Sequence, residues 1–258
     1  MFEQIKRIHS YRHTLWNMSI SQFKAKYSGS KLGIWWAVIT PLILAFSINF
    51  IFTKIFKVAI PNYTLFVLSG MIIWIFFANT LSEATNSFIA NASIIKQAIF
   101  PRELIPLSVV LANFLNFLTG LLIIIPLFII LNPKVIVVLF FLIFPLIFNL
   151  FLVVGLSLIL SCWNVFSRDV AHFLSIALMI WFWVTPVFYS FQMIPGNYRW
   201  IPLLNPMSYY VILCRQILFN AQAPNFLILG MAFLLALGAF FLGYYVFLKN
   251  EAELLKRI

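Results

Sequence analysis

The sequence predicts an all-α integral membrane protein with six transmembrane helices, and three observations support this prediction. Of the 258 residues, 64% are hydrophobic and 9% are charged, whereas a soluble domain is about 45–50% apolar and about 25% charged. The charged residues divide the chain into long uncharged runs. These runs are continuously apolar, for example from Leu121 to Leu131, and do not alternate in polarity as membrane β-strands do. A soluble domain, a disordered chain and a disulfide scaffold are therefore excluded.

The uncharged runs set the number of spans. A helix needs about 20 mostly apolar residues to cross a bilayer, and each long run suits one span but not two. Residues 31–258 are therefore expected to form one transmembrane domain, preceded by a leader at 1–30. The six spans are expected near 32–53, 63–82, 106–131, 135–160, 171–190 and 224–248.

The distribution of lysine and arginine predicts the orientation. Six spans place both termini on one side, which then carries 12 basic residues against five on the other side. Because basic residues are enriched in cytoplasmic segments, both termini are expected in the cytoplasm. The net charge of +11 then reflects orientation and attraction to anionic lipid headgroups. Binding of nucleic acid is not expected, since the charge is dispersed among the spans. Cys162 and Cys214 fall on opposite sides, so no disulfide is expected between them.

The leader is expected to form an amphipathic helix along the membrane surface. Its apolar residues recur at near-helical spacing with basic residues between them; they are Phe2, Ile5, Ile8, Leu15 and Trp16. His9 and His13 share a helical face, but two histidines without further ligands do not make a metal site. No metal is expected.

Two segments between spans have distinct expected structures. The polar stretch after the second span predicts a short helix over 87–99, which ends before Pro101 because the residue before proline is pushed out of the helical region. On the outer face, 191–222 carries prolines at three positions and is too interrupted to span. Irregular segments at membrane depth must be buried in protein or line a cavity. Short re-entrant helices are therefore expected there.

Several functions lack their sequence signatures. No ionisable residue lies in the middle of a span, although proton-coupled transporters generally need such residues. The paired broken helices of secondary transporters are also missing. No G-x-x-x-x-G-K-[ST] loop is present, so the chain is expected to bind no ATP. No carboxylate pair, H-E-x-x-H motif or nucleophile elbow indicates an enzyme.

Four stretches, in order from about residue 20 to 220, carry a family resemblance. They are 23–36 (FKAKYSGSKLGIWW) followed by Pro41, 99–107 (IFPRELIPL), 166–170 (FSRDV), and 185–189 (TPVFY) with 194–195 (IP), 204–207 (LNPM) and Arg215. Together they resemble the permease subunits of ABC-2 type exporters for bacterial surface polysaccharides, such as O-antigen and wall teichoic acid.

The resemblance implies a transport subunit and not an enzyme. It implies a homodimer in the bacterial inner (plasma) membrane, with two copies of a separate ATPase subunit that bind ATP and Mg. These subunits would drive a lipid-linked polysaccharide outward through a channel between the two permeases. The chain itself would bind no cofactor, and its partners would be a second copy, the ATPase, the lipid-linked glycan and membrane lipid.

Two groups of residues on the cytoplasmic side become functional candidates. Contacts with the ATPase are expected from the 87–99 helix and from the turn before span five. These candidates are Lys96, Arg102, Glu103, Arg168 and Asp169. A cytoplasmic gate is expected at Lys24, Lys26 and Tyr27, where cations suit an anionic lipid pyrophosphate. The alternative interpretation of the loop charges is a solvated surface that only sets orientation.

Aromatic and hydroxyl side chains are expected to line the substrate path, because ring faces support sugar C–H groups without strict directional demands. On one face of span one these are Trp36, Thr40, Ile43, Ser47 and Phe50. On span five they are Trp181, Thr185, Phe188 and Tyr189. The alternative interpretation is lipid-facing or packing aromatics. Asn113, Asn116, Thr119 and Gly120 are interpreted as helix–helix packing residues.

Three other functions remain open on the sequence. The chain could be an ABC-2 exporter of drugs or small lipids, a membrane-embedded glycan-processing enzyme, or a scaffold without transport activity. An ATPase that co-purifies with the chain would support the exporter, and conversion of a substrate without one would support the enzyme.

Overall fold

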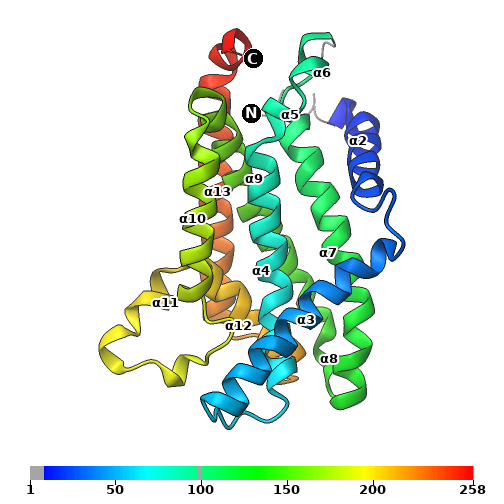
Figure 1. The fold of residues 1–258 in the computed structure, drawn as a ribbon. Helices are drawn as coiled ribbons and strands as arrows, with labels where there is room; N and C mark the ends of the chain where they lie inside the picture. Colours follow the sequence, from blue (N-terminus) through cyan, green and yellow to red (C-terminus); the bar gives the residue numbers. More distant parts are fainter. Residues whose placement is uncertain (1–8, 98–99, 258) are drawn as a thin grey trace.

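The computed structural model describes residues 9–97 and 100–257, and every regular element in them is a helix. Long helices form an elongated bundle in which the chain reverses direction from one helix to the next (Figure 1). Helix α2 (Arg12–Ala25) lies beside α7 (Leu104–Leu131). The upper end of Figure 1 carries α5, α6 and the end of α13, and the lower end carries α8, α11 and α12. The all-α prediction is confirmed.

Five segments are long and apolar enough to cross a membrane: Gly33–Ile55, Tyr63–Thr85, Leu104–Leu131, Val135–Phe166 and Phe226–Leu254. They correspond to the expected spans one to four and six. The first joins η1 (Gly33–Trp35), α3 (Trp36–Phe50) and a π-helical turn η2 (Ile51–Ile55). The second and third are the single helices α4 (Tyr63–Thr85) and α7. The fourth consists of three consecutive elements, α8 (Val135–Val138), η3 (Leu139–Leu142) and α9 (Ile143–Phe166). The last lies within α13 (Phe226–Arg257).

The expected fifth span is shorter than predicted. Helix α10 covers Asp169–Val184 and has 16 residues, whereas the sequence predicted a span up to residue 190. Thr185 ends the helix in an extended conformation (φ −82°, ψ 133°) because Pro186 follows it. Phe188 and Tyr189 therefore lie beyond the helix, and the prediction that they share a helical face with Trp181 and Thr185 is wrong.

Short helices occupy the two ends of the bundle. At the upper end, the expected helix over 87–99 is broken into α5 (Ser87–Ala90) and α6 (Ala92–Gln97), separated at Asn91; Ile99 lies outside the described residues. A single continuous helix there was therefore a wrong expectation. The lower end carries η4 (Phe191–Met193), η5 (Gly196–Tyr198), α11 (Trp200–Leu204) and α12 (Pro206–Leu218).

Helix α4 lies at the centre of the bundle. Its apolar window is 78% buried, compared with 17–28% for the other four span candidates. The main core packs around it and includes Phe77, Phe128 and Tyr210. A second cluster fills the upper end and includes Phe88, Leu104 and Phe247. The low burial of the other spans leaves wide apolar faces that a bilayer or other chains would cover.

Helices α9 and α13 approach each other closely through small residues. A Cβ atom added to Gly155 would collide with the backbone carbonyl of Ala239, and one added to Gly243 would collide with the backbone of Gly155. Small residues allow helix backbones in membranes to come this close. Gly155 and Gly243 therefore form the closest part of the contact between α9 and α13.

Candidate functional site

The leader is attached to the bundle by a charged and polar cluster. Lys26 Nζ lies 2.7 Å from both carboxylate oxygens of Glu83, at the upper end of α4, and donates to Asn113 Oδ1 at 2.7 Å. Asn113 Nδ2 in turn donates to Glu83 Oε2 at 2.7 Å. Three segments distant in sequence therefore meet in one hydrogen-bonded triangle. The Lys26–Glu83 ion pair thus connects the end of the leader helix to α4, whereas the Arg257–Glu253 pair lies within α13.

Two further pairs extend the cluster along α7. The Tyr27 hydroxyl donates to Asn116 Oδ1, and Gln22 Nε2 donates to Ser108 Oγ at 3.0 Å. Burial raises the pKa of Tyr27, so its phenol stays protonated as a donor at neutral pH. Leu15 and Met18 add apolar contacts with the upper-end core. The leader helix is therefore docked along α7 by the side chains on its α7-facing side.

The gate candidates have different surroundings. Lys26 and Tyr27 lie inside the cluster, with 22% of the Lys26 side chain exposed. Lys24 is exposed to solvent. The two lysines that the sequence treated alike therefore differ: the charge of Lys26 is matched by Glu83, and only Lys24 presents its charge outward. Asn113 and Asn116, interpreted from the sequence as packing residues, are hydrogen-bond partners of the leader. Their spacing of three residues on one helical face was the available signal.

Replacing Lys24 by glutamate is expected to weaken binding of an anionic lipid at the leader without undocking it. The exposed charge changes sign, while the pairs made by Lys26, Tyr27 and Gln22 remain. Binding of the purified chain to anionic vesicles should fall, by about 1 kcal/mol for each basic charge lost, and its melting temperature should stay unchanged. A drop in melting temperature would show that Lys24 supports the fold instead.

The expected ATPase contacts gather at the upper end but differ in exposure. The backbone of Lys96 lies in α6, and its side chain is outside the described part of the chain. Arg102 is half-buried, donates to the Phe100 carbonyl at 3.1 Å and lies over the Phe100 ring. Glu103 is 2% exposed. Arg102 and Glu103 are therefore half-buried and buried at the start of α7, whereas Arg168 and Asp169 are exposed; contact of these residues with an ATPase stays a prediction.

One asparagine ties the two groups of coupling candidates together. Asn164, buried near the end of α9, donates to the Thr85 carbonyl at 3.0 Å and to Asn86 Oδ1 at 3.3 Å. Its own Oδ1 accepts from the Ala171 backbone N–H at 3.3 Å. The turn that carries Arg168 and Asp169 is thus hydrogen-bonded to the junction of α4 and α5.

The path candidates of span one share an outward face. Trp36, Thr40, Ile43, Ser47 and Phe50 are all exposed on α3. This placement agrees with the helical spacing predicted from the sequence. It leaves the face available to a channel, to a second copy or to lipid.

The path candidates near span five are turned inward. Trp181 Nε1 donates to Asn205 Oδ1 at 2.7 Å, and Asn205 Nδ2 donates to Thr185 Oγ1 at 2.9 Å. Thr185 and Phe188 are buried, and Tyr189 donates to the Val184 carbonyl at 2.6 Å. In the single chain these side chains hold the turn after α10 against the start of α12. Their role in a substrate path stays a prediction.

The lower end has its own buried charge. Arg215 on α12 is 7% exposed, and its Nη2 donates to the carbonyls of Pro186 and Val187 at 2.8 and 2.7 Å. Its guanidinium also lies 3.8 Å from the centre of the Phe66 ring. The sequence identified Arg215 only as part of a motif, although a lone arginine in a long uncharged run was a signal for a specific environment.

The described residues contain no group of three or more His, Cys, Asp or Glu side chains placed to hold a metal ion.

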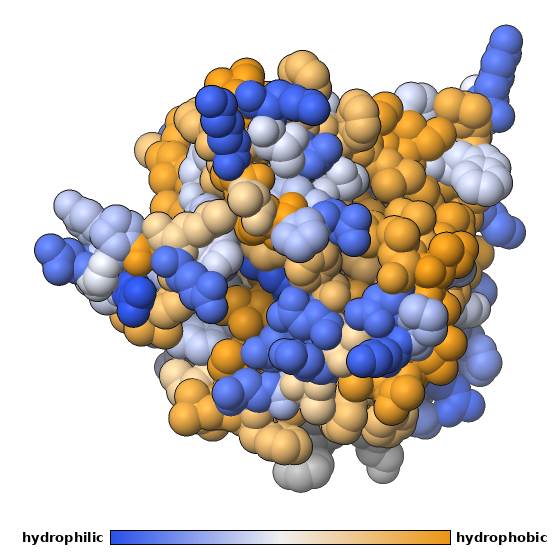
Figure 2. Space-filling model, turned by 90° about the horizontal axis from the view of Figure 1, so that it is seen from below, coloured by the Kyte–Doolittle hydropathy of each residue, from blue (hydrophilic) through white to orange (hydrophobic). Residues whose placement is uncertain are grey.

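The surface of the lower end is chemically mixed. Hydrophilic side chains are interspersed with hydrophobic ones there (Figure 2).

Comparisons with known proteins agree with this architecture. The family model described as "ABC-2 type transporter" matches residues 13–219. The chain is 36% identical over 209 residues to the O-antigen export system permease protein RfbA of Klebsiella pneumoniae, with 76% of each chain covered. It is 37% identical over 198 residues to another Klebsiella pneumoniae protein of that name, again with 76% of each covered. A Myxococcus xanthus RfbA is 29% identical over 233 residues, with 87% of each covered. The chain therefore belongs to the ABC-2 type transporter family and is a membrane permease.

Proposed function

We propose that this chain is the membrane subunit of an ATP-driven exporter that moves a lipid-linked, O-antigen-like polysaccharide from the cytoplasm to the outer face of the bacterial inner membrane. The observation that carries the proposal is the identity to O-antigen export permeases over most of the chain. The proposed substrate class also includes teichoic-acid-like glycans that are linked to a lipid.

The proposal assigns the upper end of the bundle to the cytoplasm. The exposed turn between α9 and α10, which carries Arg168 and Asp169, and the end of α13 lie there (Figure 1). We also propose that α10 completes a sixth crossing. Its 16 residues reach about 24 Å, which is most of a hydrocarbon core of about 30 Å, and Thr185 continues the chain in an extended conformation. Six crossings return the chain to the side on which the leader lies.

ATP hydrolysis is assigned to two copies of a separate ATPase, and the channel to a homodimer of this chain. The exposed faces of α3 and α10 support the dimer, because their apolar side chains lack partners within the chain that the structure describes. Examples are Phe46, Phe173 and Met179, each more than 60% exposed. The Arg168–Asp169 turn supports the ATPase contact, since it is exposed and hydrogen-bonded to α4 through Asn164.

Reversing both charges of the exposed turn, Arg168→Glu with Asp169→Lys, is expected to release the ATPase. These residues project from the described surface, so the fold should survive the change while the charge pattern that the partner meets is inverted. The measurement is the amount of ATP-binding subunit that co-purifies with the tagged chain from its native membrane, followed by surface polysaccharide in the same cells.

The matched control is Arg199→Glu, an exposed charge reversal at the lower end. We expect the control to keep both the ATPase and surface glycan. A chain that never co-purifies with an ATPase, even without substitution, would overturn the exporter and favour a membrane enzyme. An ATPase retained by the double variant would place the contact elsewhere.

A further inference from the structure

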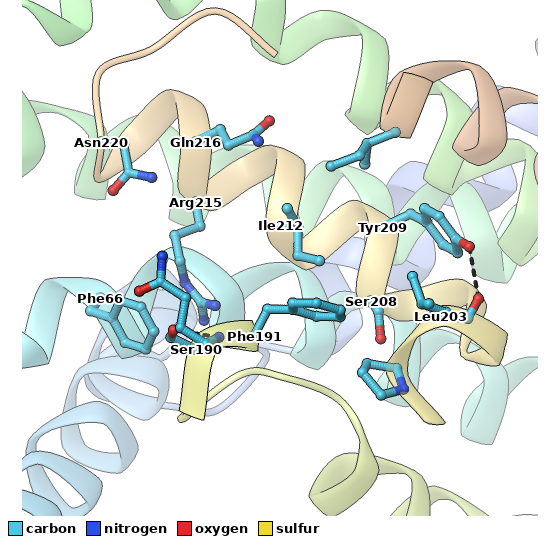
Figure 3. A pocket seen from close by; sticks show the side chains of 13 residues that line it. Phe66, Ser190, Phe191, Leu203, Ser208, Tyr209, Ile212, Arg215, Gln216 and Asn220 are labelled. Carbon is cyan, nitrogen blue, oxygen red and sulfur yellow. Dashed lines mark hydrogen bonds between the residues drawn. The ribbon is translucent and has the colours of Figure 1, made fainter. Parts of the chain in front are cut away.

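The lower end contains a cavity of about 570 Å³ between α12, the turn after α10, and the beginning of α13. Figure 3 shows Arg215 and Phe66 on one side of it, with Phe191, Ile212 and Tyr209 further along. This volume lies in the usual range for small-ligand sites, about 300–1,000 Å³. Aromatic, aliphatic and polar side chains line it together, as is common in ligand-binding sites.

Two buried polar atoms of the lining lack partners within the described residues. They are Nε of Arg215 and Oγ of Ser208, in side chains that are 7% and 1% exposed. Buried polar groups are almost always hydrogen-bonded, and leaving one unpaired costs about 1–3 kcal/mol. Neither donor is satisfied by the chain, although each atom itself lies beneath the cavity surface, with less than 1 Å² exposed.

Within the described residues, no carboxylate pairs with the charge of Arg215. The acidic residues are Glu3, Glu83, Glu103, Asp169, Glu251 and Glu253, so none occurs between residues 169 and 251. Glu83 lies on the same helix as Phe66, about 25 Å away along the helix axis. The guanidinium stays charged at all physiological pH values, and backbone carbonyls with one aromatic ring are its only described partners.

The surroundings distinguish between kinds of anion. Ile212, Leu203 and Ile228 give the cavity an apolar wall, and α13, one of the span candidates, begins beside it at Phe226. A molecule with a negative headgroup and a hydrocarbon portion satisfies both the charge and the wall. A zwitterionic headgroup would also bring a cation, for which the lining offers no carboxylate.

We propose that this cavity binds the phosphate of a net-anionic phospholipid headgroup, which the positive charge of Arg215 attracts. The headgroup would fill the cavity and its glycerol end would leave along Ile212 and Ile228. The site is independent of the direction of transport, and its occupancy would stabilise the contact between α12 and the turn after α10.

Removing Arg215 itself would also release the carbonyls of Pro186 and Val187, so the test adds a repelling charge instead. Gln192 lines the cavity and is exposed, and none of the described side-chain hydrogen bonds uses its amide. Gln192→Glu changes charge with almost no change in shape. Gln222→Glu is the matched control, because Gln222 is exposed and outside the lining.

The experiment follows the melting temperature of the full-length chain in detergent as phosphatidylglycerol, phosphatidylcholine or inorganic phosphate is added, since a ligand that binds the folded state raises it. Phosphatidylglycerol should raise the melting temperature of the unsubstituted chain and of Gln222→Glu. Gln192→Glu should need at least about tenfold more lipid for the same rise, because the added charge lies within several ångströms of the headgroup.

The other results overturn the proposal. Equal responses of the three chains to phosphatidylglycerol would mean that the lipid acts elsewhere. An equal response to phosphatidylcholine would remove the selectivity for anionic headgroups. A full response to inorganic phosphate alone would assign the cavity to a free anion and not to a lipid.

Discussion

Replacing Lys26 by glutamate is expected to undock the leader from α7 and to stop transport. The substitution places a second carboxylate beside Glu83, where the ammonium group now lies 2.7 Å from both oxygens. It also removes the donor to Asn113. With 22% of the lysine and 46% of the glutamate side chain exposed, the cost lies between those of surface and buried pairs, at about 2 kcal/mol. The ratio of docked to undocked leader would then fall about thirtyfold.

A thiol cross-link can report docking directly. Gln22 Nε2 and Ser108 Oγ are hydrogen-bonded across the same interface at 3.0 Å. A short bifunctional thiol reagent should therefore join the pair Gln22→Cys and Ser108→Cys in the docked chain, since the two shortened side chains leave a gap between their sulfur atoms. Adding Lys26→Glu should lower the cross-linking yield. The charge swap Lys26→Glu with Glu83→Lys should restore much of it, because the pair is re-formed in reverse.

The cross-link also distinguishes two roles that Lys26 could have, which are to hold the leader in place and to present a positive charge to the substrate. If the swap restores docking but not transport, the position of the positive charge matters to the substrate. If it restores both, the pair acts by holding the leader. An unchanged cross-linking yield in the single variant would contradict the docking role of the pair.

Adding one methyl group at Gly243 is expected to destabilise the protein strongly, whereas the same change at Gly238 on the same helix should not. A Cβ at Gly243 would meet the backbone of Gly155, so α9 and α13 would have to separate. Overpacking of this kind costs about 3 kcal/mol when backbone must move. At Gly238 a Cβ would meet nothing within 4 Å, and alanine is the better helix former by up to about 1 kcal/mol.

Thermal unfolding of the two purified variants provides the comparison. Gly243→Ala should melt well below the unsubstituted chain, and Gly238→Ala at or slightly above it. Gly155→Ala should behave like Gly243→Ala, because both glycines belong to one contact. Similar melting temperatures for Gly243→Ala and Gly238→Ala would mean that the two helices can move apart without loss.

Much of the fold could be predicted from the sequence because a bilayer leaves few alternatives. Backbone polar groups in hydrocarbon must be satisfied within helices or closed barrels, so long apolar runs define spans. The predicted spans at 63–82, 106–131 and 135–160 all fall within observed helical segments. The family could also be predicted, since its motifs lie in short local stretches that need no knowledge of the fold.

Local chemistry explains the errors at element ends. A run of 29 uncharged residues before Arg199 suggested a full fifth span, but Pro186 and the conformation of Thr185 end α10 at Val184. The helix expected over 87–99 breaks at Asn91, whose side chain donates to the Ser87 carbonyl at 2.8 Å and so competes with the helical backbone. Hydropathy does not register either effect.

The sequence by itself determined the membrane class, five of the spans and the family, because these depend on composition and on order along the chain. The tertiary structure alone decided which polar groups meet. Lys24 and Lys26 are equivalent in the sequence, and only folding places one beside Glu83 and leaves the other in solvent. Arg215 and Phe66 are likewise far apart in the chain and touch in the bundle. Such pairs arise from the packing of helices whose apolar faces tolerate several arrangements, so no local pattern specifies them.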